Sequence, residues 1–252
     1  MKLKKPQLVS IVIPCYNEER RIEALRRSLS AVRMFPFKTE LILVDDGSTD
    51  GTVKKARRIL TSFRHTILRH RHNLGKGAAV KTGILAARGQ FIIFSDADFS
   101  TPIEEISKLL QALETCDVVI GVRRHPKSNV LRHQPKLREF LGHVFTQLTN
   151  FFLIPGIYDA TCGFKGYRKE PARILFTAMK IKGWAFDAEI LFLVRKYRMR
   201  IAQVPVKWSD NPATKVYLLR DGLLSLLDLV KIRWFDLIGV YDKRKFAVNA
   251  EI

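Results

Sequence analysis

Residues 91–98 read FIIFSDAD, a short apolar run followed by two carboxylates with one alanine between them. A continuous apolar run of this length is typical of a strand that is buried on both faces of a sheet. The sequence therefore predicts a central strand here, with Asp96 and Asp98 at its carboxyl end.

Similar strands and intervening helices are predicted on either side of this stretch. The other strands are expected at residues 8–14, 40–44, 66–68 and 117–121. Helical periodicity is found at residues 18–34, 50–61, 75–88 and 102–114. Strands that alternate with helices predict an α/β fold with a mostly parallel sheet covered by helices.

This alternation ends after Gly121. Residues 123–136 are basic and rich in turn-forming residues, and strands are expected again at 162–167 and 201–208. Helices are expected at 138–153, 187–198 and 222–240. With no Gly-, Ser- or Pro-rich linker in view, we expect one domain over residues 1–218 and an amphipathic C-terminal segment over residues 219–252.

The composition indicates an anionic partner. The 252 residues have a net charge of +20, of which +13 falls after residue 119. Nucleic acid, a nucleotide and an anionic membrane surface are all compatible with this charge. Three cysteines without a CxxC pair argue against a zinc ribbon or a disulfide scaffold and favour a reducing compartment. No apolar stretch is long enough for a membrane-spanning helix.

Polar clusters follow three of the predicted strands, at residues 14–18, 45–50 and 96–98. In parallel sheets, ligands bind at the carboxyl ends of the strands. A helix cap or a turn explains each cluster taken alone. Carboxylates repel one another, however, and three clusters at one edge favour a bound cation or phosphorylated ligand. Asp96 and Asp98 suit Mg²⁺, which takes one or two carboxylates and completes its shell with water and phosphate.

The segment RHNLGKG at residues 71–77 is similar to half of a phosphate-binding loop. It lacks the spacing of a Walker A motif, and no GxGxxG follows the first strand. Its glycines would allow a phosphate to approach a helix N-terminus, but simple helix entry is an equally good interpretation.

Together these motifs resemble the family 2 glycosyltransferases. The resembling segments are VSIVIPCYNEE, LILVDDGSTDGT, RHNLGKGAAVKTG and FSDADFSTPIEE. The resemblance implies a GT-A fold, a nucleotide-sugar donor, a divalent cation (Mg²⁺ or Mn²⁺) and inversion at the anomeric carbon. In the second half, DATCGFKGY, GWAFDAEILFL and VPVKWSDNPATKV resemble polyprenyl-phosphate transferases. The likeness is greatest to dolichyl-phosphate β-glucosyltransferases, followed by dolichyl-phosphate mannose synthases.

The resemblance implies a role for each matching residue. Asp96 and Asp98 match the family's metal and diphosphate motif, with Ala97 between them. The residues that match nucleotide contacts are Pro14, Tyr16, Glu18 and Asp46.

Further matches concern the phosphates and the acceptor. Arg123 and Lys215 match residues that hold the donor or acceptor phosphate, and Asp159 and Asp187 fall in acceptor-side motifs. The residues expected to act in catalysis are Asp98, Arg123, Asp159 and Asp187.

The implied reaction transfers glucose from UDP-glucose to a dolichyl or polyprenyl phosphate. The implied location is the cytoplasmic face of a membrane, bound peripherally to an anionic surface. Helix 222–240 would place Trp234, Phe235 and Leu237 at the lipid boundary. Phe145, Phe151 and Phe152 would do the same in helix 138–153, although core packing is a competing explanation for both helices.

Three alternative functions remain open. A GDP-mannose-dependent synthase is weakened by Ser100, because mannose synthases commonly have glutamine at that place. Ala160 and Thr161 replace the Thr-Gln of related transferases, which leaves the role of that glutamine in doubt. A soluble sugar acceptor is possible, but Val230 replaces the glutamine of the QxxRW motif of polymer synthases. A nucleic-acid-binding protein rests on charge alone, and no nucleic acid is expected as a partner.

Overall fold

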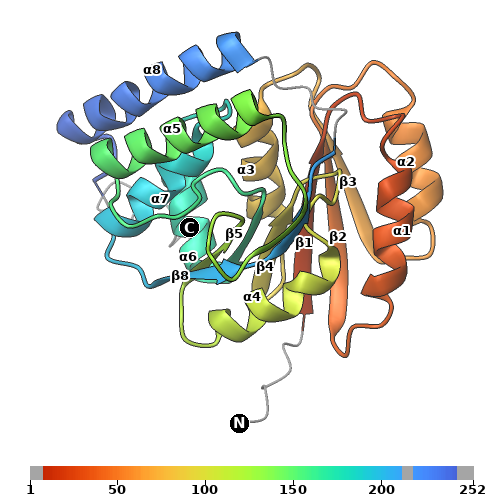
Figure 1. Ribbon diagram of the computed structural model, residues 1–252. Helices are drawn as coiled ribbons and strands as arrows, with labels where there is room; N and C mark the ends of the chain where they lie inside the picture. The colour runs from red at the N-terminus through yellow and green to blue at the C-terminus, as the bar shows by residue number, and fades with distance from the viewer. Residues whose placement is uncertain (1–7, 212–217, 243–252) are drawn as a thin grey trace.

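A seven-stranded sheet with helices on both faces dominates the structure, a computed structural model that describes residues 8–211 and 218–242 (Figure 1). The strands of this sheet are β1 (Leu8–Cys15), β2 (Lys38–Asp45), β3 (His65–Arg69), β4 (Phe91–Ser95), β5 (Val118–Val122), β7 (Phe164–Arg168) and β8 (Ile201–Pro205). The helices are α1 (Glu23–Val32), α2 (Thr52–Leu60), α3 (Lys76–Ala86), α4 (Ile106–Leu113), α5 (Lys136–Phe152), α6 (Lys169–Ala178), α7 (Phe186–Lys196) and α8 (Leu218–Leu237), with a short 3₁₀ turn at Ile103–Glu105.

The sheet is mostly parallel, as the sequence predicts. Its strand order is β3-β2-β1-β4-β7-β5-β8, and every neighbouring pair is parallel except those that include β7. The antiparallel insertion of β7 between β4 and β5 is not expected from the sequence. It follows from where the chain arrives: Gly163 lies at the carboxyl end of β4, because its carbonyl accepts a hydrogen bond from the Asp96 amide at 3.0 Å. Because the chain enters the sheet at this end, β7 runs antiparallel to β4.

Two apolar cores lie on the two faces of the sheet. The first core lies under helices α1, α2 and α4 on one face, and the second core lies under α3, α6 and α7 on the other. Side chains alternate along β1, so Ile11 and Ile13 point into the first core and Val12 into the second. Gly83 lets α3 lie directly on the sheet, because a Cβ there would be 2.3 Å from Cγ1 of Val12. This close packing fixes the N-terminus of α3 at the edge where the ligand site is predicted.

Three elements differ from expectation. The basic segment 123–136 contains a short strand, β6 (Asn129–Arg132), which pairs with β9 (Lys207–Ser209) in a separate two-stranded sheet. The single strand expected over 201–208 is divided after Pro205, because β8 pairs with β5 whereas β9 leaves the large sheet and pairs with β6. Helix α6 is also new, although its buried Ala172, Leu175 and Phe176 have the spacing of a helical face.

Helix α8 belongs to the same packed body as the sheet. It lies beside α5 and contacts α5 and α7 (Figure 1). Leu229 and Ile232 are buried in the second core. The division into 1–218 and 219–252 stays a prediction. Within residues 8–211 and 218–242, no helix is both long enough and apolar enough to cross a membrane.

Candidate active site

The site is built around the turn that follows β4. The amide of Phe99 donates to the Asp96 carbonyl at 3.1 Å, and the amide of Ser100 donates to Oδ1 of Asp98 at 3.0 Å. Phe99 has a positive φ of 49°, so the chain reverses tightly here. Gly163 packs against the Asp96 carboxylate, because a Cβ at this position would lie 1.8 Å from Oδ2. The turn therefore holds Asp96 and Asp98 together at the sheet edge.

Lys76 is the cation next to this carboxylate pair. Its Nζ lies 2.7 Å from Oδ1 of Asp96 and 5.0 Å from the centre of the Trp184 ring. Burial disfavours the charge on Lys76, but Asp96, Asp187 and Asp98 more than offset this effect, so its pKa is raised. The ammonium group therefore stays charged beside Asp96. Lys76 is the lysine of the half phosphate loop, which the sequence marks without assigning it a role.

The carboxylate pair fits a divalent cation bound together with a diphosphate. The side chains of Asp96 and Asp98 are 34% and 22% exposed, so both can be reached. Burial and the charge of Asp96 raise the pKa of Asp98, and a bound cation would relieve this repulsion. The described part of the chain has no cluster of three or more metal-binding side chains. A cation held here would take its remaining ligands from phosphate and water, as Mg²⁺ commonly does.

The start motif after β1 connects to this pair through Arg21. Nε and Nη2 of Arg21 each lie 2.6 Å from an oxygen of Glu18, and Nη1 lies 3.9 Å from Oδ2 of Asp98. Glu18 thus orients Arg21 toward Asp98. Pro14 lies within β1, and Tyr16 is 37% exposed at the same edge. Nucleotide contacts by Pro14, Tyr16 and Glu18 stay predictions.

Asp46 is directed into the protein. Its carboxylate accepts hydrogen bonds from the amides of Leu74 and Gly75, at 3.0 and 2.9 Å, and pairs with Nδ1 of His70 at 2.6 Å. Gly75 has a φ of 102°, which suits glycine at the entry to α3. In this structure Asp46 shapes the loop that presents Lys76, and the expected contact with base or ribose stays a prediction.

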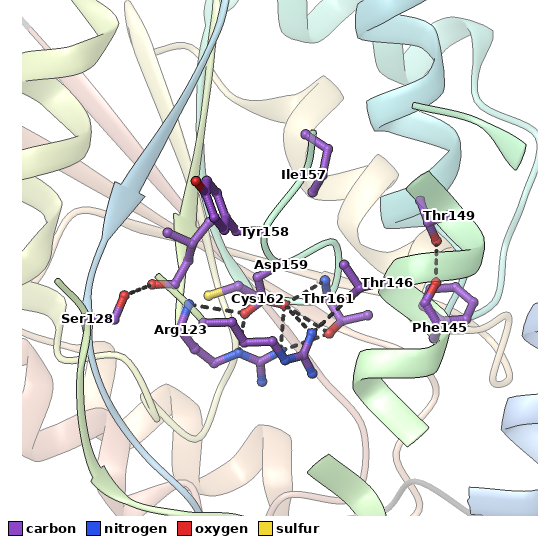
Figure 2. A network of polar contacts seen from close by, with 12 residues as sticks. Arg123, Ser128, Phe145, Thr146, Thr149, Ile157, Tyr158, Asp159, Thr161 and Cys162 are labelled. Carbon is purple, nitrogen blue, oxygen red and sulfur yellow. Dashed lines mark hydrogen bonds and ion pairs between the residues drawn. The ribbon is translucent and has the colours of Figure 1, made fainter. Parts of the chain in front are cut away.

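Arg123 and Asp159 form a buried, two-pronged ion pair (Figure 2). Nε of Arg123 lies 2.6 Å from Oδ2 of Asp159, and Nη2 lies 2.8 Å from Oδ1. Nη2 also donates to Oγ1 of Thr161 at 2.8 Å, and the guanidinium lies 5.3 Å from the Trp208 ring centre. Thr161, one of the two departures from the related motif, thus orients Arg123.

This ion pair decides which chemistry suits Asp159. Burial by itself would raise the pKa of Asp159, but Arg123 outweighs it and holds that pKa well below its usual range. Arg124 adds a weaker contact at 3.4 Å. A carboxylate held in this way is a poor proton acceptor. Asp159 is therefore placed to orient Arg123, while a catalytic role for either residue stays a prediction.

Asp187 lies in the first turn of helix α7 and is electrostatically coupled to Asp96. Its Oδ1 lies 2.8 Å from Nζ of Lys165, which is fully buried in β7. Burial raises the pKa of Asp187 despite the nearby ammonium groups of Lys165 and Lys76. Lys165 is a site residue that the sequence reading missed, although a lone lysine inside the strand CGFKGY was an available signal. Lys215 lies outside the described residues.

A second unexpected network holds the loop that packs against Lys76. The buried carboxylate of Glu189 accepts hydrogen bonds from the amides of Lys180 and Ile181, at 2.8 and 2.7 Å, and from the Tyr241 hydroxyl at 2.5 Å. The loop that Glu189 holds contains Trp184 and the Lys182 carbonyl, which accepts a hydrogen bond from the Ala78 amide at 3.2 Å. Glu189 and Tyr241 therefore fix the loop that packs over Lys76.

Comparison with known proteins defines the class. The model of glycosyl transferase family 2 matches residues 10–176, which include the start motif, the Asp96–Asp98 pair and Asp159. The chain belongs to glycosyl transferase family 2.

Within this family, the chain is similar to dolichyl-phosphate β-glucosyltransferases. It is 32% identical to the Dictyostelium discoideum enzyme, over 92% of this chain and 76% of that protein. It is 32% identical to the Saccharomyces cerevisiae enzyme, over 94% of this chain and 77% of that protein. It is 31% identical to the human enzyme, over 92% of this chain and 77% of that protein. The predicted resemblance is confirmed.

Solved structures confirm the fold. Glucosyl-3-phosphoglycerate synthase from Mycobacterium tuberculosis, in complex with Mn²⁺, UDP-glucose and glycerol 3-phosphate, aligns with a TM-score of 0.66 over 90% of this chain and 80% of that chain, at 19% identity. Mannosyl-3-phosphoglycerate synthase from Rubrobacter xylanophilus aligns with a TM-score of 0.68 over 92% and 75%, at 19% identity. The mostly parallel, GT-A-like architecture predicted from the sequence is therefore correct.

Proposed function

We propose that this protein transfers glucose from UDP-glucose to the phosphate of a dolichyl or polyprenyl lipid, with inversion and with a divalent cation, Mg²⁺ or Mn²⁺, at Asp96 and Asp98. The observation that supports this most is the partly exposed carboxylate pair beside the ammonium of Lys76, whose side chain is 17% exposed. The named activity of the similar glucosyltransferases supports the choice of sugar and acceptor. The solved complex with Mn²⁺ and UDP-glucose supports the donor and the cation.

In the proposed reaction, an oxygen of the lipid phosphate attacks C1 of glucose as the bond from C1 to the UDP β-phosphate oxygen breaks. The electron pair of the broken bond leaves with UDP. A phosphate monoester has a second pKa of about 6, so near neutral pH it needs no strong base. The low pKa of Asp159 agrees with a reaction that does not use this carboxylate as a base.

The residues of the chain then act through alignment and charge. Lys76 is placed to face negative charge that develops on the diphosphate, because its ammonium lies at the N-terminus of α3 beside Asp96. When bound, the cation supplies further positive charge against that diphosphate. Arg123, held rigidly by Asp159 and Thr161, would hold the acceptor phosphate or the diphosphate (Figure 2). Such preorganised charge is a main source of catalysis in enzymes.

The acceptor places the protein at a membrane, and α5 and α8 supply a surface that fits one. On α8, five apolar side chains spaced by three or four residues are 50–76% exposed: Leu223, Leu227, Val230, Trp234 and Leu237. On α5, a matching row is 38–82% exposed: Leu137, Phe140, Val144 and Phe151. Two neighbouring helices that turn apolar rows outward suit peripheral binding at a lipid interface.

Two residues of the predicted membrane face are wrongly assigned. Phe145 and Phe235 are partly buried and pack against the second core, whereas Trp234, Leu237, Phe151 and Phe152 are exposed. One residue along a helix rotates the side chain by about 100°, and this step turns Phe235 from the side of Trp234 toward the core. Binding at the cytoplasmic face of an anionic membrane is part of the proposal.

A donor and acceptor panel tests this function. Purified protein is incubated with UDP-glucose, UDP-galactose or GDP-mannose, with a polyprenyl phosphate or a free sugar, and with or without Mg²⁺ or Mn²⁺. We expect lipid-linked glucose from UDP-glucose and polyprenyl phosphate only when the cation is present. Transfer to a free sugar but not to the lipid phosphate would contradict the proposed acceptor, and a preference for GDP-mannose would contradict the donor.

A further inference from the structure

A basic hollow lies at the C-terminal ends of α5, α7 and α8, away from the sheet edge that holds the candidate active site. Its volume is about 420 Å³, and its walls include Phe151, Phe152 and Phe192. The opposite end of α5 faces the active site, where Arg138 interacts electrostatically with Arg123 and Asp98. With 17 residues and a rise of about 1.5 Å each, α5 separates the two places by roughly 25 Å.

The charges around the hollow are unequal. Arg195 and Lys196 from α7 and Arg233 from α8 line it together with a single carboxylate, Asp236. Nζ of Lys196 lies 2.5 Å from Asp236, whereas Nη1 of Arg233 is 3.8 Å from the same carboxylate. Arg195 donates one long hydrogen bond of 3.4 Å, to the Leu153 carbonyl. Each guanidinium has five N–H donors, so these contacts use only part of their capacity.

Three cations around one carboxylate leave an excess of positive charge, which the carbonyl ends of the three helices offset only in part. The hollow can be reached from solvent, because the side chains of Arg233 and Lys196 are 50% and 34% exposed. A phosphate group suits this arrangement, since guanidinium groups bind its oxygens in pairs. Both a lipid headgroup and a soluble molecule carry such a phosphate group.

The surroundings of the hollow indicate a lipid as the source. Phe151, at its rim, is 82% exposed, and Trp234 and Leu237 on the neighbouring turns of α8 are 59% and 76% exposed. These side chains belong to the outward apolar rows of α5 and α8. The two helices lie side by side (Figure 1). A soluble phosphate would gain nothing from them, whereas a phospholipid presents its phosphate next to acyl chains that they can contact.

We propose that this hollow binds the phosphate headgroup of an anionic glycerophospholipid, so that the protein docks on the membrane in one orientation. The proposal rests on the membrane-bound function inferred above. Headgroup binding at one end of the α5–α8 layer leaves the other end, with the active site, at the same lipid surface. The polyprenyl phosphate then reaches its site without leaving the bilayer.

The test compares two variants with equal loss of charge. One is Arg195→Gln with Arg233→Gln, and the control is Arg57→Gln with Arg58→Gln, two exposed arginines on α2, which covers the opposite face of the sheet. Binding is measured by cosedimentation with phosphatidylcholine vesicles that contain none or a third of phosphatidylglycerol. Because each basic residue near an anionic surface contributes about fivefold in binding, we expect the hollow variant to lose about thirtyfold toward anionic vesicles. The control should lose less than twofold, and an equal loss in both variants would overturn the proposal.

A second measurement tests for a defined site and identifies the source of the phosphate. Monomeric dihexanoyl phosphatidylglycerol, dihexanoyl phosphatidylcholine and inorganic phosphate are titrated separately and followed by NMR. Saturable binding of the phosphatidylglycerol alone, lost in the hollow variant, supports the proposal. Equal binding of inorganic phosphate, or no saturable binding of the lipid, contradicts it. Glucosyl transfer to a detergent-dispersed short polyprenyl phosphate should not change in the hollow variant, so its absence in the wild type would instead refute the proposed function.

Discussion

The carboxyl edge of the sheet and the α5–α8 layer use positive charge in opposite ways. At the sheet edge each cation faces a carboxylate at hydrogen-bonding distance, as in the pairs Lys76–Asp96, Arg123–Asp159 and Lys165–Asp187. On the outer layer, basic side chains flank exposed apolar rows. Asp236 pairs closely with Lys196 alone, whereas Arg233 lies 3.8 Å from it and Arg195 donates to the Leu153 carbonyl. Fixed pairs hold groups for chemistry, whereas shared and exposed cations suit a mobile surface such as a membrane.

The largest effect is expected from Asp98→Asn. Loss of one carboxylate removes half of the protein ligands available to a cation, and removal of one preorganised charge typically lowers kcat by about 10²–10³-fold. Initial rates with UDP-glucose and polyprenyl phosphate across a Mg²⁺ titration measure the loss. The melting temperature should not fall, because burial and Asp96 both disfavour the charge on Asp98. Wild-type turnover with metal present would refute the metal assignment.

Arg123→Gln should affect both activity and stability. Without Arg123, Asp159 is left buried with weaker partners, and breaking such a pair costs about 3 kcal/mol of unfolding free energy. Denaturant titrations measure this cost, and the matched variant Arg124→Gln should lose much less, because Arg124 is 3.4 Å from the carboxylate. Equal losses in the two variants would contradict the special role of the two-pronged pair.

The same pair predicts a pH dependence. The pKa of Asp159 is depressed in the folded protein, so its contribution to stability is present above the unfolded value of about 4 and is lost as the pH falls below it. The stability difference between wild type and Arg123→Gln should therefore be largest near pH 7 and shrink with acidification. Urea titrations at several pH values measure it. A difference that grows on acidification would show that Asp159 is not held by Arg123.

Part of the fold and of the candidate site can be predicted from the sequence, and part cannot. The apolar runs predict β1, β2, β4 and β5, because buried parallel strands need continuous apolar residues. The motifs predict Asp96, Asp98, Arg123, Asp159 and Asp187 as site residues, and the fold brings all five to one region. Lys165 and Glu189 were missed, because a buried charge is explained only by its partner, and their partners lie 22 and 52 residues away in the chain. The reversal of β7 is likewise set by tertiary contact.

A smaller effect is expected from Tyr241→Phe, which removes the hydroxyl that donates to Glu189. A buried hydrogen bond to a charged group contributes about 1.5–3 kcal/mol. If this network positions the loop over Lys76, the KM for UDP-glucose should rise several-fold while the KM for polyprenyl phosphate stays constant. A merely structural role would lower the melting temperature and leave both KM values unchanged. Tyr197→Phe is the matched control, because it removes a hydroxyl that donates to the Tyr241 carbonyl at 3.1 Å and leaves the bond from Tyr241 to Glu189 in place.

The smallest effect on the folded protein, and the sharpest contrast with the sheet edge, is expected from Trp234→Gln with Leu237→Gln. Both side chains are mostly exposed, so the unfolding free energy should change by less than about 0.5 kcal/mol, the usual range for surface substitutions. Each substitution removes apolar area that a lipid interface would cover, so binding of the double variant to vesicles should weaken about tenfold or more. The side chain of Leu229 is buried, so the matched variant Leu229→Gln should destabilise the fold instead. If the double variant binds vesicles as the wild type does, the outward rows of α5 and α8 do not face the membrane.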